Sequence, residues 1–348
     1  MSSMSSVYVL GAGASRAESA EIPIVSDFLS KAFNLGKFSS PDATSFIQAI
    51  SSRFGLDVGD LKNGSVDIEQ VFTLIDTDIA WEEHDRPDGV SWLRSSIARS
   101  TIEGLLGGVL FPVMKPVLVN GAPLHKRLVE RTKPGDSILT FNYDLIIDKA
   151  LLDTNKFTRS GYCIEFSGGV DSSSERLHKT PTDAGQSEVK LLKLHGSLNW
   201  LGYHYPKKTR ILYLEDGLTT LNLAAEGWGP SIQLKEEGDY DGYLKPLLVP
   251  PSSDKSHVWE THNGAMRGLW VKAGEALQEC ATLFVLGYSL RDADYQARWL
   301  FRRFLADRQD KPQIWVVNSN PDHRCRLRSF FRSLGAVVES YSFEDFVG

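Results

Sequence analysis

The feature that most constrains the fold is an apolar run followed directly by glycines, VYVLGAG at residues 7–13. Residues 7–10 are β-branched, aromatic or aliphatic, which is typical of a buried strand. Gly11 and Gly13 then allow a sharp turn and a close approach of the backbone to a ligand. Backbone N–H groups of residues 11–15, with a helix start behind them, can bind phosphate oxygens. The run predicts a strand that opens a nucleotide site, although a plain tight turn would use the same residues.

Further apolar runs alternate with helical patterns along the chain. Strands are predicted at residues 137–141, 189–194, 282–286, 313–317 and 336–341, and helices at residues 124–131, 145–152, 264–280, 294–306 and 321–334. This alternation predicts an α/β fold, a Rossmann-like parallel sheet with helices on both faces. Ligands of such sheets bind at the carboxyl ends of the strands. The polar or small residues at these ends are Gly11, Asn142, His195, Ser289 and Asn318.

Residues 37–110 have a different character, because apolar residues recur there at helical spacing. Asp67 and Gln70 form a predicted capping box for a helix that begins at residue 68. Glu69 and Asp76 lie off its apolar stripe, so we expect them to be solvated. A further helix is expected from about residue 92 to 110. The predicted organisation is a discontinuous Rossmann-like domain, 1–36 and 111–348, with a helical insertion at 37–110.

Two polar stretches lack a clear period. Residues 153–188 predict a long loop, and residues 200–245 predict a polar insertion of short strands and turns. Seven acidic residues lie between positions 215 and 241. Such a run is usually a solvated face, so we do not interpret it as a metal site.

Composition limits the classes of partner. The net charge of −6 over 348 residues disfavours non-specific nucleic-acid binding by the whole surface. A local excess of ten Lys and Arg over five acidic residues, between positions 291 and 332, predicts exposed helix faces or, as the alternative, a partner interface. The three cysteines are far apart, which indicates free thiols and no metal. No apolar run of about 18 residues and no secretory leader is present, so we expect a cytoplasmic protein without a membrane partner.

Five short motifs at the predicted strand ends carry a resemblance. They are Gly11-Ala12-Gly13-Ala14-Ser15, Thr140-Phe141-Asn142-Tyr143-Asp144, His195-Gly196, Gly287-Tyr288-Ser289 and Val317-Asn318. In order and spacing they resemble the sirtuin superfamily, in its divergent bacterial SIR2-like branch associated with anti-phage defence. The resemblance implies NAD as substrate, with no metal required.

The resemblance also implies roles for individual residues. Asn142 and His195 correspond to the catalytic pair, with Asp144 in support. The residues implied to bind the cofactor are Gly11, Ala12, Gly13, Ser15, Thr140, Gly287, Ser289 and Asn318.

These residue types suit cleavage of the bond between nicotinamide and ribose. A carboxamide at Asn142 can bind a ribose hydroxyl or orient a water without titrating. The imidazole of His195, with a reference pKa of about 6.5, can accept a proton near neutral pH. Structural roles stay open for both, since Asn142 can begin the following helix and His195 can be a hydrogen-bonded core residue. Ser289 can likewise cap the helix that follows it.

Two departures from the sirtuin pattern favour hydrolysis. Residues 200–245 contain no cysteine, so the four-cysteine zinc ribbon is absent, and residues 16–20 and 25–26 replace the deacylase Asp-Phe-Arg. We therefore expect an NAD+ glycohydrolase that depletes NAD+ in defence and is activated by assembly or a partner. The alternatives are an NAD-dependent protein deacylase and a catalytically silent module that binds NAD or ADP-ribose. The resemblance implies a homo-oligomer or a separate partner such as an Argonaute protein, a HerA-like ATPase or a sensor.

Overall fold

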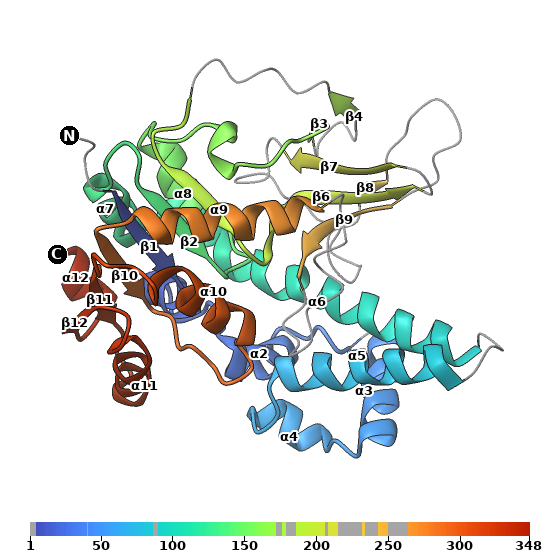
Figure 1. Ribbon diagram of the computed structural model, residues 1–348. Helices are drawn as coiled ribbons and strands as arrows, with labels where there is room; N and C mark the ends of the chain where they lie inside the picture. Colours follow the sequence, from blue (N-terminus) through green and yellow to red (C-terminus); the bar gives the residue numbers. More distant parts are fainter. Residues whose placement is uncertain are drawn as a thin grey trace.

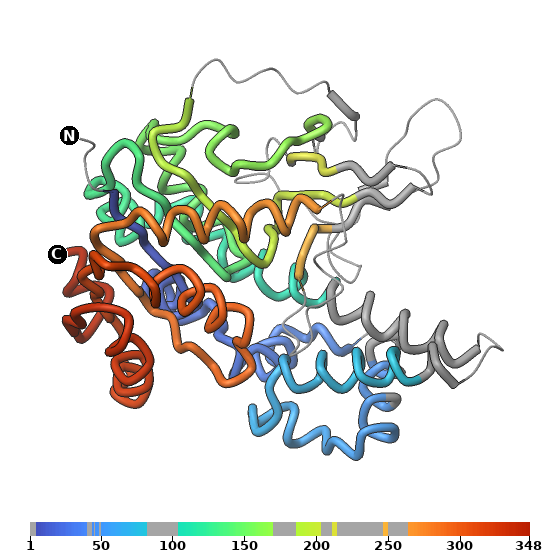
Figure 2. Tube along the Cα trace, viewed as in Figure 1, coloured from blue at the N-terminus to red at the C-terminus, as the bar shows by residue number. Residues whose placement is uncertain are grey.

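Two β-sheets and a group of helices make up the described part of the chain (Figure 1). The computed structural model describes residues 5–39, 41–85, 90–171, 176–178, 186–205, 208–214, 232–233, 243–249 and 264–348. Figure 2 follows the path from the first strand into the helical group and back to the sheet.

The first sheet is the predicted parallel sheet. Its six strands lie in the order β12-β11-β10-β1-β2-β5, and every neighbouring pair is parallel. The strands are β1 (Ser6–Leu10), β2 (Ser137–Thr140), β5 (Lys190–Lys193), β10 (Thr282–Leu286), β11 (Gln313–Val317) and β12 (Ala336–Ser340). The last four residues of β1 are all buried, as a central strand covered on both faces requires. The predicted fold class is confirmed.

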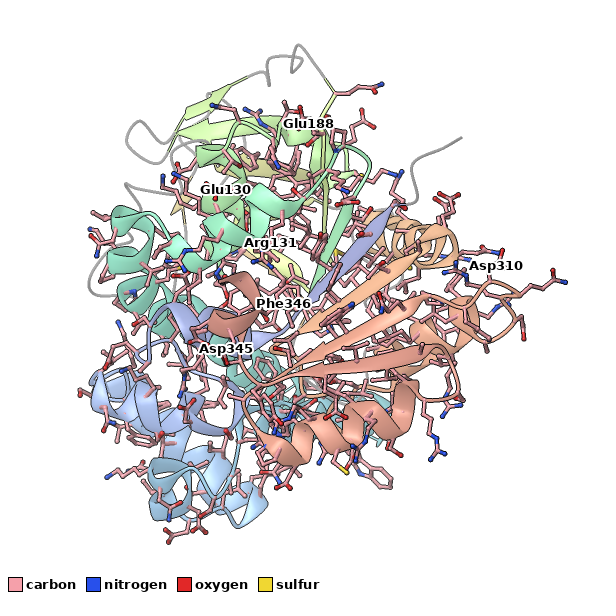
Figure 3. All side chains as sticks on the ribbon, turned by 90° about the vertical axis from the view of Figure 1, so that its left-hand side faces the viewer. Glu130, Arg131, Glu188, Asp310, Asp345 and Phe346 are labelled. Carbon is pink, nitrogen blue, oxygen red and sulfur yellow. The ribbon has the colours of Figure 1, made fainter. Side chains whose placement is uncertain are left out.

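Helices cover both faces of this sheet (Figure 1). One face carries α9 (Ala265–Glu279), α10 (Tyr295–Leu305) and α11 (Pro321–Phe331), and the other carries α1 (Ala12–Glu18), α7 (Pro123–Arg131), α8 (Ile146–Asp153) and α12 (Phe343–Val347). This division follows from right-handed crossovers between parallel strands that spread in both directions from β1. Arg131 joins α7 to α12 by donating to the carbonyls of Phe346 and Val347 (Figure 3).

The helical group follows α1 in the chain. It contains η1 (Val25–Asp27), α2 (Phe28–Asn34), α3 (Pro41–Phe54), α4 (Val58–Asn63), α5 (Ile68–Asp85) and α6 (Val90–Asn120). Its apolar side chains form a second core, which also includes Leu145, Ile146 and Leu198. The predicted capping box is present, since Asp67 and Gln70 exchange hydrogen bonds between side chain and backbone. We retain residues 37–110 as the proposed limits of the insertion.

Helix α6 does not end at residue 110 as predicted, because it continues to Asn120 through Pro112 and Pro116. Each internal proline costs about 3 kcal/mol of helix stability. Five apolar side chains in this stretch are buried, and each contributes about 1.5–3 kcal/mol; they are Phe111, Val113, Met114, Val117 and Leu118. Tertiary packing thus outweighs the local cost of the prolines.

The second sheet corrects another expectation. It contains β3 (Gly168–Asp171), β4 (Arg176–His178), β6 (Gly196–Tyr205), β7 (Lys208–Leu214), β8 (Ile232–Gln233) and β9 (Tyr243–Leu248), in the order β4-β3-β7-β6-β9-β8. Residues 153–188 are therefore not one long loop, since they include β3, β4 and the short helix η2 (Arg159–Tyr162). The fully buried Tyr162 packs edge-on against Trp200 and anchors this stretch. The acidic residues between positions 215 and 241 lie outside the described residues.

Among the described residues, no single helix has the length and apolar character needed to cross a membrane. Residues 104–120 and α7 reach that length and apolar character only when they are taken together, and the two helices are bent by 65° at the break between them.

Candidate active site

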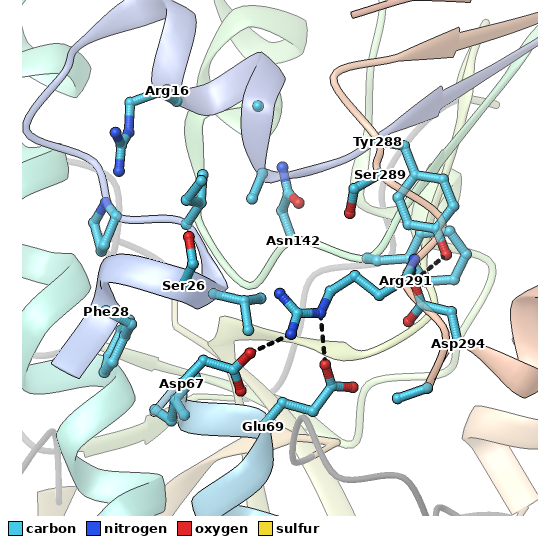
Figure 4. Close-up of a pocket in the computed structure, with 18 of the residues that line it drawn as sticks. Arg16, Ser26, Phe28, Asp67, Glu69, Asn142, Tyr288, Ser289, Arg291 and Asp294 are labelled. Carbon is cyan, nitrogen blue, oxygen red and sulfur yellow. Dashed lines mark hydrogen bonds and ion pairs between the residues drawn. The ribbon is translucent and has the colours of Figure 1, made fainter. Parts of the chain in front are cut away.

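The register of the parallel sheet brings the predicted site residues to one edge. Leu10 at the end of β1 lies beside Thr140 of β2 and Leu286 of β10, and Leu286 in turn lies beside Val317 of β11. The residues that follow these strands therefore stand side by side. A cavity of about 1140 Å³ opens over this edge, large enough for a dinucleotide (Figure 4). The predicted site residues that line it are Ala12, Gly13, Ser15, Asn142, Asp144, His195, Gly287, Ser289 and Asn318.

The glycines hold two loops in direct backbone contact. A Cβ on Gly11 would lie 2.5 Å from the Cα of Tyr288, and one on Gly287 would lie 2.1 Å from the nitrogen of Ala14. Gly287 also has φ +61°, a conformation that L side chains rarely adopt. The N–H groups of Gly11 and Gly13 donate to the carbonyls of Leu286 and Gly287. These two N–H groups thus bind the end of β10 and the residue that follows it, and the close approach that the sequence predicted is an approach of backbone to backbone.

The carboxamide of Asn142 has a determined orientation. Its nitrogen Nδ2 donates to the carbonyl of Gly11 and to the hydroxyl of Ser15, both at 3.0 Å. A carbonyl oxygen can only accept, so Nδ2 and not Oδ1 must face Gly11. The oxygen Oδ1 consequently faces away from α1, toward the space between Asn142 and Ser289 (Figure 4). Asn142 therefore presents a hydrogen-bond acceptor to the cavity.

Asp144 and Thr140 complete this hydrogen-bond network; Asp144 lines the cavity, and Thr140 does not. Asp144 is buried, accepts from the Ser15 hydroxyl at 2.7 Å, and accepts from the Ile146 N–H at the start of α8. Thr140 is buried outside the cavity wall, donates to the carbonyl of Leu10 and accepts from the N–H of Asn142 at 3.0 Å. Thr140 thus positions the backbone of Asn142, and the carbonyl of Gly11 accepts from the Asn142 side chain.

His195 follows β5 and faces the same cavity. Its ring is edge-on to Phe141 at 5.1 Å and lies 6.3 Å from the ring of Tyr143. These two aromatic residues flank Asn142 in the chain, so the imidazole and the carboxamide come from adjoining strand ends. The next residue, Gly196, has φ +81°, and a Cβ there would lie 2.0 Å from the carbonyl oxygen of Leu247. The His-Gly turn therefore requires glycine where the second sheet begins.

Ser289 and Asn318 lie on the loops after β10 and β11. Ser289 does not cap the following helix, because the residue at the start of α10 is Asp294. Asp294 instead accepts from the hydroxyl of Tyr288 at 2.8 Å. Burial, reinforced by the Asp294 carboxylate, raises the pKa of Tyr288 well above its ordinary value. Asn318 donates to the carbonyl of Tyr288 and accepts from the N–H of Asn320, so it connects the two loops as well as lining the cavity.

One cluster in the cavity was not predicted. Arg291 forms ion pairs with Asp67 and Glu69 at the start of α5, the second with Nε 2.8 Å from Oε2 (Figure 4). Glu69 is buried, so the expectation that it is a solvated charge is wrong, and Asp76 is half-buried. Periodicity could not reveal this, because the partner of the α5 carboxylates lies 224 residues away. The cluster crosses the cavity between the helical group and the Ser289 loop.

A second ion pair holds the other side of the helical group to α1. The Arg16 side chain forms an ion pair with Asp27 and donates to the carbonyl of Ile22. This links the end of α1 to the segment that begins α2. Arg16, which lines the cavity, is thus kept in place by local contacts.

Comparison with known protein families identifies the chain. The SIR2-like domain matches residues 136–338, which is more than half of the sequence. The chain belongs to the SIR2-like family. The matched segment of this SIR2-like chain runs from β2 to β12 and contains Asn142, His195, Ser289 and Asn318.

Solved structures similar to this SIR2-like chain are sirtuins. A sirtuin from work on substrate affinity matches with a TM-score of 0.41 and 13% identity, over 99% of this chain and 91% of that one. A SIR2 protein in complex with an inhibitor, 2′-O-acetyl-ADP-ribose and a deacetylated peptide matches with a TM-score of 0.40 and 14% identity, over 99% and 90%. The comparison with curated proteins found no match.

The described part of this SIR2-like chain holds no group of three or more His, Cys, Asp or Glu residues that could bind a metal ion. The arrangement instead offers an oriented amide oxygen, an imidazole and a buried carboxylate at one end of a large cavity. These groups can bind hydroxyls, orient a water and accept a proton.

Proposed function

We propose that this protein is an NAD+ glycohydrolase that cleaves NAD+ to nicotinamide and ADP-ribose. Membership of the SIR2-like family supports an NAD-related activity in general. The observation that carries the finer proposal is the orientation of Asn142, whose nitrogen is committed to Gly11 and Ser15. Its oxygen can accept a hydrogen bond from a ribose hydroxyl or from the attacking water.

In this proposal His195 is the proton acceptor. Cleavage develops positive charge at the ribose carbon as neutral nicotinamide leaves, and water then adds there. The imidazole accepts the proton that the water loses, because a histidine side chain can take up and release a proton near neutral pH. Asp144 supports the site through Ser15 and adds negative charge near the developing cation.

Two departures from the sirtuin pattern support hydrolysis over deacylation. Residues 200–245 contain no cysteine for a four-cysteine zinc ribbon, and residues 16–20 and 25–26 replace the deacylase Asp-Phe-Arg. We further propose that the activity depletes NAD+ in anti-phage defence and that assembly or a partner chain activates it.

Product analysis tests the proposal. The purified protein is incubated with NAD+, alone and with the products of neighbouring genes, and nicotinamide and ADP-ribose are separated by chromatography. Asn142→Ala and His195→Ala should each reduce turnover by a factor of about 10²–10⁴. Asn120→Ala, at the exposed end of α6 and outside the cavity, is the control and should match the wild type.

Two outcomes would refute this function. Transfer of an acetyl group from a peptide to ADP-ribose would identify a deacylase. Tight NAD+ binding without any product, with every partner supplied, would identify a binding module.

A further inference from the structure

The far end of the cavity has a different character from the end near Asn142. It is lined by residues from the loop after β11 and from the first turns of α11, namely Asn318, Ser319, Asn320, His323 and Arg326. Three strand spacings separate β11 from β2 in the sheet order. At about 4.8 Å per spacing, the two ends lie roughly 14 Å apart. A dinucleotide with its nicotinamide ribose at Asn142 would place its adenosine at this far end.

The cations in the cavity wall differ in whether they have partners. Arg16 is paired with Asp27, and Arg291 is paired with Asp67 and Glu69. Within the described ranges of the chain, Arg326 has no ion pair and no side-chain hydrogen bond. It is an exposed residue one turn beyond His323 on α11.

His323 experiences the same positive charge. Burial lowers the pKa of His323 and the charge of Arg326 lowers it further, while Asp322 acts in the opposite direction and Arg291 adds a smaller lowering effect. Arg291 is matched by Asp67 and Glu69, so in the described ranges Arg326 is the cation at this end of the cavity that has no carboxylate partner. An anionic ligand group would be attracted to Arg326 and would favour the protonated form of His323 beside it.

The part of the cavity wall that follows β11 differs from the loop after β10, whose Asp292 and Asp294 line the cavity. Dinucleotide sites that bind an unmodified adenosine ribose commonly place Asp or Glu on its 2′-hydroxyl, whereas an Arg accommodates a 2′-phosphate. Of the cavity-lining residues after β11, which are all described, none is acidic. Asp322 lies on the same turn but is exposed and is not part of the wall.

We propose that Arg326 and His323 bind a phosphate monoester on the adenosine ribose, so that the site takes a 2′-phosphorylated dinucleotide of the NADP+ class. The inference rests on the proposed function, which places the nicotinamide end at Asn142 and His195. Arg324 keeps the loop in place for this contact, because it donates to the carbonyl of Asn318.

Calorimetric binding to the intact protein tests the proposal without requiring turnover. The ligands are 2′-phospho-ADP-ribose and ADP-ribose. The phosphorylated ligand should bind about 10- to 100-fold more tightly, which is the range for hydrogen bonds to charged groups. Arg326→Gln should remove most of this advantage while changing ADP-ribose affinity far less.

Arg328→Gln is the matched control on the same helix. Arg328 pairs with Glu339 of β12 and does not line the cavity, so both affinities should stay at wild-type values. Adenosine 2′,5′-bisphosphate and adenosine 3′,5′-bisphosphate distinguish the position of the monoester, and the 2′ isomer should bind more tightly.

Three results would overturn the inference. They are equal affinity of the wild type for the two ADP-ribose ligands, an equal loss for both in Arg326→Gln, and a preference for the 3′ isomer. A protein that discriminates the ligands but releases no nicotinamide would refute the glycohydrolase function alone. A protein that hydrolyses NAD+ without discriminating would refute only the role of Arg326 and His323.

Discussion

Replacing Arg291 by methionine should destabilise the protein more than the loss of an exposed ion pair would. The substitution keeps an apolar stem but leaves two carboxylates facing each other without a cation. The side chains of Asp67 and Glu69 are only 12% and 8% exposed, while that of Arg291 is 32% exposed. Breaking a buried pair costs about 3–5 kcal/mol, whereas exposed pairs contribute about 0–1 kcal/mol. With about a third of the Arg291 side chain exposed to water, we expect a loss of about 2–3 kcal/mol.

The dependence on pH follows from the charges. Burial lowers the pKa of Arg291, but the carboxylates of Asp67 and Glu69 outweigh it and raise the pKa above its ordinary value. The guanidinium therefore stays charged throughout the folded range, and the wild-type bridge weakens only when acid protonates the carboxylates. In Arg291→Met the same protonation removes a repulsion. The stability difference between wild type and variant should thus be largest near neutral pH and smaller in acid.

Urea denaturation of both proteins at several pH values measures this difference. Arg328→Met, which removes the more exposed pair with Glu339, is the control and should cost less than about 1 kcal/mol. Adding Glu69→Gln to Arg291→Met should recover part of the loss. A loss equal to that of the control, or one that does not change with pH, would refute the argument that the bridge stabilises the fold.

Gly287→Ala should give little folded protein, because φ +61° and a Cβ 2.1 Å from the Ala14 nitrogen leave no room for a methyl group; circular dichroism and yield report this. Thr140→Val leaves the Asn142 N–H without its acceptor, so we expect a loss of about 1–3 kcal/mol and a fall in kcat greater than the change in KM. Maleimide at pH 8 should label the exposed Cys325 first, as judged by peptide mass, because burial raises the pKa of the other two thiols.

Much of the sheet was predictable from local pattern. The strands β1, β10 and β11 are short, apolar after their first residue and bounded by glycine, proline or polar residues, so their type and order follow from the sequence. Parallel pairing follows from the helices between them. The convergence of Asn142 and His195 at one edge followed from topology alone.

The sequence-based predictions were wrong where contacts with distant residues outweighed the local preference of a segment. Residues 111–120 contain two prolines, yet buried neighbours keep them helical. Glu69 was predicted to be solvated because it lies off the apolar stripe of its helix, but Arg291, far along the chain, pairs with it. A short-range pattern contains no information about such contacts.

The sequence by itself determined which residues stand at the strand ends, since the strand period and the glycine turns are local properties of the chain. Only the tertiary structure decided which polar groups face the cavity and which bind the protein itself. The orientation of Asn142 depends on a carbonyl 131 residues away, and the N–H groups of Gly11 and Gly13 are taken by the loop after β10. The physical reason is that a hydrogen bond is set by the register of neighbouring strands, which forms only when distant segments pack together.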